Sequence, residues 1–210
     1  MSLHIEVLSE AQKAIIPMLA TFATEQKFYL AGGTAVALHL GHRRSIDFDW
    51  FAHGNFEDPI SLAEKARLAG LPVEDVQVSR GTLHTVIGGV KVSFFEYLYH
   101  PISSFTTWPD DTFTLASLDD LACMKLVAIA QRGSRKDFID LYTIALEHKP
   151  VSEFLELYRQ KYSVGDIGHV LVGMTYFDDA QDEPSPIMLR EFSWDDIKRY
   201  FQQWAKTLSD

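Results

Sequence analysis

The feature that most constrains the fold is a stretch of alternating side chains at residues 41–51, which reads GHRRSIDFDWF. Alternation with a period of two predicts a β-strand over residues 45–51 with one apolar face. That face carries Ile46, Phe48 and Trp50. Asp47 and Asp49 share the opposite face, where positions i and i+2 lie roughly 6.5 Å apart along the strand. The two carboxylates are therefore either solvated on an exposed strand or placed to hold divalent cations.

The segments around this strand predict an α+β fold. Ser9 and the capping box Ser61-x-x-Glu64 mark the starts of two helices, and Gly88-Gly89 marks a hairpin turn. Helices are expected over residues 8–23, 34–40 and 61–70, and strands over residues 28–31, 76–78, 83–87 and 90–95. After residue 117 the pattern is mostly helical, with a polar loop over residues 178–186. We therefore expect a small mixed β-sheet flanked by helices, followed by a mostly helical C-terminal part.

The charge balance limits the kinds of partner that the chain can bind. The formal net charge is −10, which argues against an extended, non-specific footprint on nucleic acid, although Arg43-Arg44 and residues 132–136 form local basic patches. The single cysteine, Cys123, lies in an apolar helical pattern and is expected to be a buried thiol. No apolar stretch of about 18 residues and no signal-peptide pattern is present, so we expect a cytoplasmic protein without a membrane contact.

Two glycines stand between the strand expected at residues 28–31 and the helix that follows it. Gly32 and Gly33 would let the backbone approach a ligand closely, and the helix start at Thr34 would offer N–H groups to a phosphate. A Gly-Gly pair alone often only makes a turn. Its combination with the two aspartates shortly downstream is more specific and points to a phosphorylated ligand with a divalent cation.

Three segments together resemble a known family. They read LAGGTAVALHLGHRRSIDFDWF, KVSFFEY and KLVAIAQRGSRKDFIDLY. This combination is similar to the AbiEii/AbiGii toxin family of the DNA-polymerase-beta-like nucleotidyltransferase superfamily, over residues 28–142. The resemblance implies a nucleotidyltransferase-like core in residues 1–115 and a helical region in residues 116–210 that completes the active-site cleft.

The resemblance also implies an activity. The family transfers a nucleotide from a nucleoside triphosphate (NTP) to an acceptor hydroxyl, which here would belong to an RNA end such as that of tRNA, to a protein or to a small molecule. It further implies a toxin of a toxin–antitoxin or abortive-infection system, with a cognate antitoxin as partner. Asp47 and Asp49 would hold Mg²⁺ or Mn²⁺. The nucleotide would contact Gly32, Gly33, Thr34, Arg43 or Arg44, and Ser45.

Three further residues match the family pattern as catalytic candidates. Lys125 would contact the triphosphate, and Asp137 and Asp140 would be active-site carboxylates. The residues themselves allow other roles. Lys125 lies on an apolar helix face, where its amine can extend to solvent. Asp137 and Asp140 share a helix face and can pair with nearby basic side chains or offset the helix dipole.

One departure from the superfamily pattern concerns a third carboxylate on the neighbouring strand. Ser93 occupies the expected position, and Glu96 has the opposite parity, so only a β-bulge would bring it to the same face. The alternative to an active enzyme is therefore a catalytically weak nucleotide-binding or protein-interaction module. A phosphate-ester hydrolase built on the two aspartates, or a zinc site that uses His39 and His42, are further alternatives.

Overall fold

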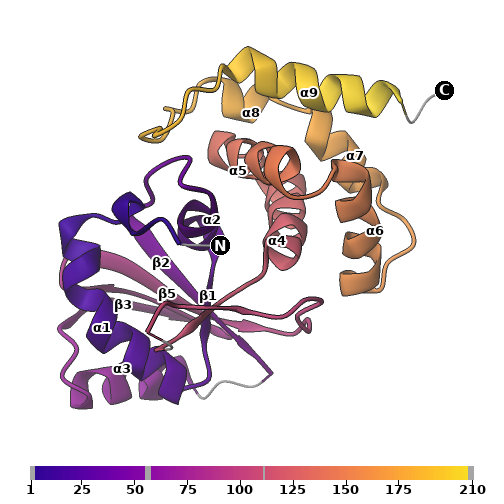
Figure 1. Cartoon of the computed structure of the whole chain (residues 1–210). Helices are drawn as coiled ribbons and strands as arrows, with labels where there is room; N and C mark the ends of the chain where they lie inside the picture. The colour runs from indigo at the N-terminus through magenta and orange to yellow at the C-terminus, as the bar shows by residue number, and fades with distance from the viewer. Residues whose placement is uncertain (1–2, 55–57, 111, 208–210) are drawn as a thin grey trace.

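The computed structural model describes residues 3–54, 58–110 and 112–207. Within these ranges one mixed sheet has the strand order β3-β4-β5-β2-β1-β7-β6 (Figure 1). The strands are β1 (Tyr29–Ala31), β2 (Asp47–His53), β3 (Val73–Ser79), β4 (Thr82–Ile87), β5 (Val90–Tyr97), β6 (Thr106–Thr107) and β7 (Thr114–Leu115). The predicted α+β class is thus confirmed.

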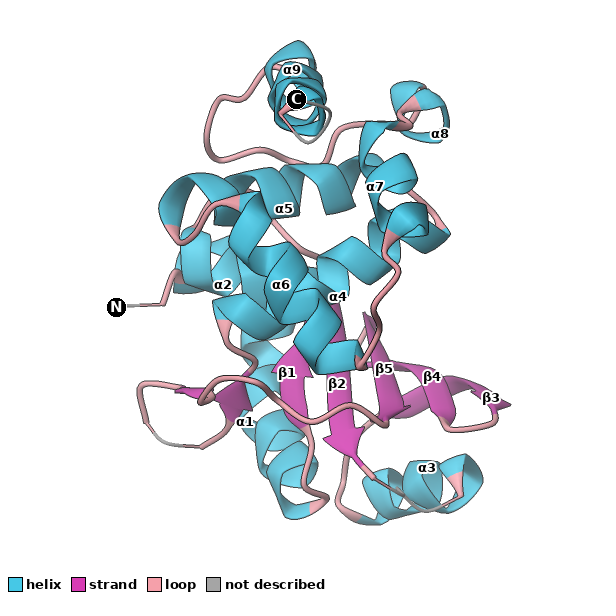
Figure 2. Ribbon diagram, turned by 90° about the vertical axis from the view of Figure 1, so that its right-hand side faces the viewer, coloured by secondary structure: helices cyan, strands magenta, loops and turns pink. Residues whose placement is uncertain are grey.

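The helices divide between the two faces of this sheet. They are α1 (Glu10–Glu25), α2 (Gly32–Leu40), α3 (Pro59–Leu68), α4 (Leu118–Gln131), α5 (Arg135–Glu147), α6 (Val151–Tyr162), α7 (Gly168–Thr175), α8 (Asp178–Gln181) and α9 (Trp194–Lys206), after a short 3₁₀ turn, η1 (Ile5–Val7). Figure 2 shows α1 and α3 below the sheet and the C-terminal helices above it. None of the described helices is long and apolar enough to cross a membrane.

Strand β2 lies at the centre of the described sheet, and both of its edges are paired. It runs antiparallel to β1 and parallel to β5, with Asp49 opposite Ser93. Its apolar side chains Phe48 and Trp50 are fully buried on the side of α1. On β5, Phe94 packs in the same layer against Phe22 of α1, with ring centroids 6.1 Å apart. The period-two pattern therefore places β2's polar face towards the C-terminal helices.

Several local predictions are confirmed. The helix start expected at Ser9 is present, because Ser9 and Gln12 form a reciprocal capping box at the start of α1. Strands β4 and β5 form the expected hairpin, with Ile87 opposite Val90. The Cys123 thiol is buried.

Other boundaries were wrong. Helix α2 begins at Gly32 rather than Thr34, and β2 begins only at Asp47, so Ile46 precedes the strand and is 70% exposed. Helix α3 begins two residues before Ser61, because Asp58 is the N-cap and accepts the Ser61 N–H. The loop expected over residues 178–186 begins with the short helix α8.

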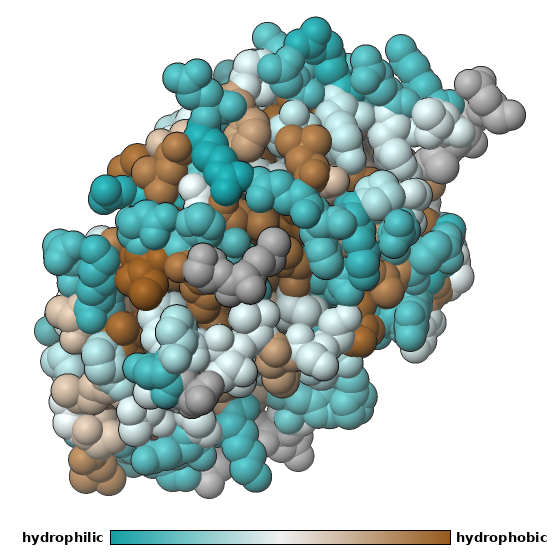
Figure 3. All heavy atoms as spheres, in the orientation of Figure 1, coloured by the Kyte–Doolittle hydropathy of each residue, from teal (hydrophilic) through white to brown (hydrophobic). Residues whose placement is uncertain are grey.

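The C-terminal helices are joined to the sheet-bearing part by a strap, which we define as residues 182–192. Its Met188 forms an isolated antiparallel bridge with Arg43. The Arg44 N–H donates to the Ile187 carbonyl at 2.8 Å, and the Leu189 N–H donates to the His42 carbonyl at 2.9 Å. The strap thereby fixes the loop between α2 and β2. Figure 3 shows that mainly hydrophilic side chains cover the visible face, with apolar patches between them.

Candidate active site

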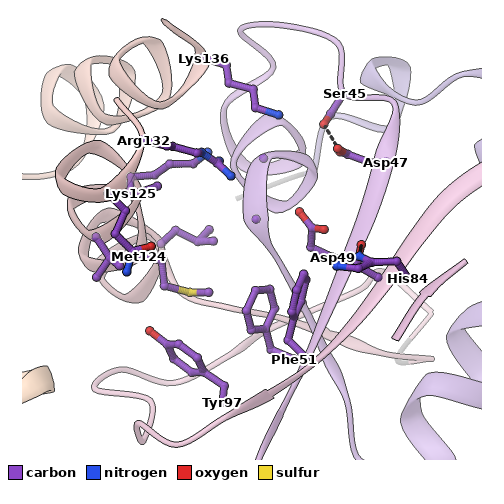
Figure 4. Close-up of a pocket in the computed structure, with 18 of the residues that line it drawn as sticks. Ser45, Asp47, Asp49, Phe51, His84, Tyr97, Met124, Lys125, Arg132 and Lys136 are labelled. Carbon is purple, nitrogen blue, oxygen red and sulfur yellow. Dashed lines mark hydrogen bonds between the residues drawn. The ribbon is translucent and has the colours of Figure 1, made fainter. Parts of the chain in front are cut away.

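A cavity of about 440 Å³ lies between the polar face of the sheet and helices α2, α4 and α5 (Figure 4). Its lining residues are Gly32, Gly33, Arg43, Ser45, Asp47, Asp49, Phe51, His84, Ser93, Phe95, Tyr97, Leu121, Met124, Lys125, Val127, Ala128, Gln131, Arg132 and Lys136. The strands supply carboxylates and aromatic rings, whereas the helices supply cations and aliphatic side chains. The cavity therefore has both a charged part and an apolar part.

Asp47 and Asp49 point into this cavity from the same face of β2, as the alternation predicted. The Ser45 hydroxyl donates to Asp47 Oδ1 at 3.2 Å. The hydroxyl of Thr34 donates to the Asp47 backbone carbonyl, which ties the start of α2 to the start of β2. Burial, together with the charge of Asp47, raises the pKa of the Asp49 carboxyl to about 6.

The start of α2 packs directly against the carboxylate pair. Gly32 has a φ of 66°, and an added Cβ would lie closer than 3.0 Å to the Asp49 carboxylate; at Gly33 it would lie equally close to the Arg43 guanidinium. Position 32 thus requires glycine, whereas a side chain at position 33 would have to displace the Arg43 guanidinium. Among the described residues, no side chain caps this helix at its N-cap, Ala31. The first-turn N–H groups are therefore available at the cavity wall.

A buried ion network supports the wall from behind. The Arg43 guanidinium donates to both oxygens of Asp140, from Nε at 2.7 Å and from Nη2 at 2.8 Å. Lys125 Nζ lies 2.6 Å from Asp140 Oδ2 and 2.9 Å from Asp137 Oδ1, and His42 Nε2 lies 2.7 Å from Asp140 Oδ1. These contacts join α2's C-terminal loop, α4 and α5.

The charges within this network stabilise one another. Burial alone would raise the pKa of Asp140, but the charges of Arg43 and Lys125 hold it well below its usual value. For Lys125, burial alone would lower the pKa, but Asp140 and Asp137 raise it above its usual value. All of these groups are therefore charged at neutral pH except His42, whose pKa is lowered by burial.

The structure brings most, but not all, of the predicted site residues together. Arg43 lines the cavity, whereas Arg44 is exposed outside it. Lys125 also lines the cavity, and its amine is not extended to solvent but held by two carboxylates. Asp137 and Asp140 are fully buried and do not line the cavity. Thr34 lies behind the cavity wall, where its hydroxyl contacts Asp47.

Two cations that the sequence indicated as part of a basic patch or as partners for aspartates, but not as site residues, also line the cavity. Arg132 donates from Nε to Asp137 Oδ2 at 2.8 Å, and its side chain is 56% exposed. Figure 4 shows the amine of Lys136, in the first turn of α5, directed towards the cavity. Both residues lie within the basic segment 132–136, so that segment was the signal for them.

The zinc alternative does not match the geometry of the described residues. His39 Nε2 is bonded to the Ala116 carbonyl at 3.0 Å, whereas His42 is bonded to Asp140. Among the residues that the structure describes, no group of three or more histidine, cysteine or acidic side chains is arranged to hold a metal ion. The two aspartates are an oxygen donor pair, which suits Mg²⁺ or Mn²⁺ better than zinc.

The carboxylate pair itself fits a divalent cation. Asp47 and Asp49 share one face of a strand, and partial burial together with the repulsion from Asp47 raises the pKa of Asp49. A cation between them would remove this repulsion. Glu96 does not add a third carboxylate, because β2 and β5 stay in register along their paired length and Glu96 does not line the cavity.

The remaining wall of the cavity is aromatic and aliphatic. Phe51 stacks on Phe95, with centroids 4.9 Å apart, and meets Tyr97 edge-on at 5.5 Å. Met124 and Val127 of α4 line the cavity opposite these rings. An apolar slot beside a charged centre is suited to a planar group such as a nucleobase.

Comparisons with known proteins agree with this geometry. The profile of the family described as "Nucleotidyl transferase AbiEii toxin, Type IV TA system" matches residues 17–209. An uncharacterised protein of Aquifex aeolicus is 33% identical over 201 residues, which cover 95% of this chain and 96% of that protein.

Solved structures extend the comparison to the fold. The nucleotidyltransferase toxin MenT4 of Mycobacterium tuberculosis superposes with a TM-score of 0.59 at 15% identity, covering 95% of this chain and 83% of that chain. The structure of JHP933 from Helicobacter pylori superposes with a TM-score of 0.55 at 15% identity, covering 99% of this chain and 93% of that chain. The chain therefore belongs to the AbiEii nucleotidyl transferase toxin family and is a nucleotidyltransferase.

Proposed function

We propose that this protein uses a divalent cation to transfer a nucleotide from an NTP to an acceptor hydroxyl. The observation that carries the proposal is the position of Asp47 and Asp49, which face one cavity together with the uncapped start of α2 and several cations. Anionic phosphates, a dication and an acceptor can meet at such a place. Asp47 and Asp49 would hold Mg²⁺ or Mn²⁺. When bound, the metal neutralises charge on the phosphates and makes the acceptor hydroxyl more acidic.

The protein's own groups would bind and orient the triphosphate. The N–H groups at Gly32 and Gly33 are available to phosphate oxygens, because the helix start faces the cavity without a side-chain cap among the described residues. Arg132 and Lys136 would neutralise further phosphate charge from the opposite wall. Ser45 holds the Asp47 carboxylate through its hydroxyl.

We propose different roles for the three catalytic candidates of the sequence analysis. Lys125 has three N–H donors, of which the two neighbouring aspartates use two, so one remains to contact a phosphate. Asp137 and Asp140 would not touch the substrate. They would hold Lys125, Arg43 and Arg132 in place, which is a positioning role.

The proposed acceptor and partners are supported by the family resemblance rather than by the geometry. An RNA end, for example of tRNA, is one acceptor class; its contact would be local, because the net charge of −10 disfavours a large footprint. A cognate antitoxin is the expected protein partner, and the cytoplasm, where NTPs are available, is the expected location. The second candidate function is nucleotide binding without transfer, which is favoured by Ser93 at the position expected for a third carboxylate.

The test is incubation with each α-³²P-labelled NTP and Mg²⁺, with total RNA and total protein as acceptors. A double variant, Asp47→Asn/Asp49→Asn, removes both carboxylates of the proposed metal site. Its matched control is Asp195→Asn/Asp196→Asn, which removes two exposed carboxylates from α9. We expect label transfer by the native protein and the control only, and omission of Mg²⁺ should abolish it. Mg²⁺-dependent NTP binding without transfer would favour the second function, and absence of both would refute the metal site.

A further inference from the structure

A row of three polar side chains crosses the sheet at the cavity. Asp49 of β2 is opposite Ser93 of β5, and Ser93 is opposite His84 of β4. All three line the cavity. In Figure 4, Asp49 and His84 both project from the strand side, opposite the cations of the helices. The register of two neighbouring strands thus places an imidazole one strand away from the position expected for a third carboxylate.

Ser93 and His84 are bonded to each other. His84 Nδ1 lies 2.9 Å from Ser93 Oγ. The exposed His84 ring also meets Phe95 edge-on, with centroids 5.5 Å apart. If the proton is on Nδ1, it is donated to Ser93 Oγ, and the lone pair on Nε2 is left to accept another proton.

The transfer proposed above needs such a proton acceptor, because an acceptor hydroxyl must lose its proton as it attacks phosphorus. Asp47 and Asp49 are assigned to the metal. The lysines and arginines that line the cavity are cations and cannot take a proton. Among the described residues that line the cavity, His84 is therefore the side chain that remains with a lone pair able to accept a proton.

We propose that His84 is the general base of the reaction and that Ser93 positions it. In this step the acceptor O–H gives its proton to His84 Nε2, its oxygen forms a bond to the α-phosphorus, and the bond from that phosphorus to the bridging α–β oxygen breaks. Pyrophosphate leaves with the electron pair of the broken bond. Ser93 Oγ accepts the Nδ1–H and fixes the tautomer. The inference rests on the proposed transfer and goes beyond it, because it assigns the proton acceptor.

Kinetics of His84→Ala test the catalytic role. We expect transfer to fall by about 10²- to 10⁴-fold, with the dissociation constant for NTP and Mg²⁺ unchanged. Added imidazole, or the Ser93→Asp change in the His84→Ala background, should restore part of the rate by supplying another proton acceptor. The matched control is His53→Ala, because His53 is an exposed strand residue that does not line the cavity.

Three outcomes of these experiments would overturn the inference. These are unchanged transfer by His84→Ala, loss of NTP binding in that variant, and failure of both imidazole and Ser93→Asp to restore activity. If the native protein transfers no label to any acceptor, the proposed function itself fails.

A second readout does not depend on activity. Long-range ¹H–¹⁵N NMR of the native protein reports which nitrogen of His84 carries the proton. We expect the proton on Nδ1, and we expect Ser93→Ala to remove that preference. A proton on Nε2 in the native protein would overturn the assignment even if transfer is observed.

Discussion

The buried ion network makes a quantitative prediction for Asp140→Asn. Asp140 is fully buried and accepts hydrogen bonds from Arg43, Lys125 and His42. The asparagine would keep the shape but remove the negative charge. Arg43 would then lose the carboxylate that it contacts, and Lys125 would retain Asp137, whose carboxylate already contacts Arg132. Removing one partner of a buried ion pair costs about 3–5 kcal/mol.

This cost corresponds to a large thermal shift. For chains of this length, 1 kcal/mol lowers the melting temperature by about 2–4 °C, so Asp140→Asn should lower it by roughly 6–20 °C. Urea unfolding followed by tryptophan fluorescence gives the free energy directly. The matched control is Asp196→Asn, which removes an exposed ion pair with Arg199. This change should not measurably alter the free energy of unfolding.

The deficit of Asp140→Asn should also depend on pH. The pKa of Asp140 is held well below its usual value in the folded protein. Its stabilising contribution is therefore complete above the unfolded pKa of about 3.9 and is lost as the pH falls through the folded pKa. The difference in free energy of unfolding between the variant and the native protein should be constant from about pH 6 to pH 8. It should become smaller below about pH 4. If Asp140→Asn lowers the free energy of unfolding by less than about 1 kcal/mol at neutral pH, the buried cations do not depend on the charge of Asp140 and the reasoning is refuted.

Three further predictions concern the cavity. Gly32→Ala should abolish Mg²⁺-dependent NTP binding in a fluorescence titration, because its Cβ would meet the Asp49 carboxylate, whereas Gly89→Ala, at a positive φ with no neighbouring atom within 4 Å, should bind normally. Asp49→Asn should be at least as stable as the native protein in EDTA at pH 7.5, because it removes a carboxyl whose pKa is raised to about 6. The same variant should lose metal-dependent NTP binding. In the native protein that binding should weaken as the pH falls through about 6, since protons then compete with the metal. Tyr97→Phe should cost about 0.5–1.5 kcal/mol in urea unfolding by removing a hydrogen bond to Tyr162, while NTP binding persists; unchanged stability would contradict this.

Local patterns predicted the parts of the site that lie close together in the sequence. The alternation around Asp47 and Asp49 was sufficient to place both carboxylates on one strand face, and Gly32-Gly33 marked the turn beside them. The same alternation misplaced the strand's start, because Ile46 continues the pattern but lies in the loop that is paired with the strap. Periodicity describes the side chains, whereas the strand boundary depends on which backbone groups find partners.

Long-range contacts explain why the roles of Lys125, Asp137 and Asp140 were not predictable. Asp140 meets Arg43 across 97 positions of sequence, and no local pattern encodes such a pairing. The sequence pattern marked Lys125 and both aspartates as candidates, but the burial of Asp137 and Asp140 behind the cavity wall depends on how α4 and α5 pack together.

His84 was missed although a usable signal existed. The Gly88-Gly89 turn sets Ile87 opposite Val90, and counting back along the hairpin puts His84 opposite Ser93. The pattern of β5 alone shows only that an acidic residue is absent at Ser93. The side chain next to that position comes from the adjacent strand β4.

The strap has a consequence for the biosynthesis of the protein. Every residue that lines the cavity lies at or before Lys136, yet the loop that carries Arg43 is hydrogen-bonded to residues 187–190. A nascent chain that has emerged only as far as α7 thus contains all the chemistry of the site but not the backbone partners that hold one of its walls. For a protein of a toxin family, this order of synthesis delays assembly of the complete site until residues 187–190 have been made.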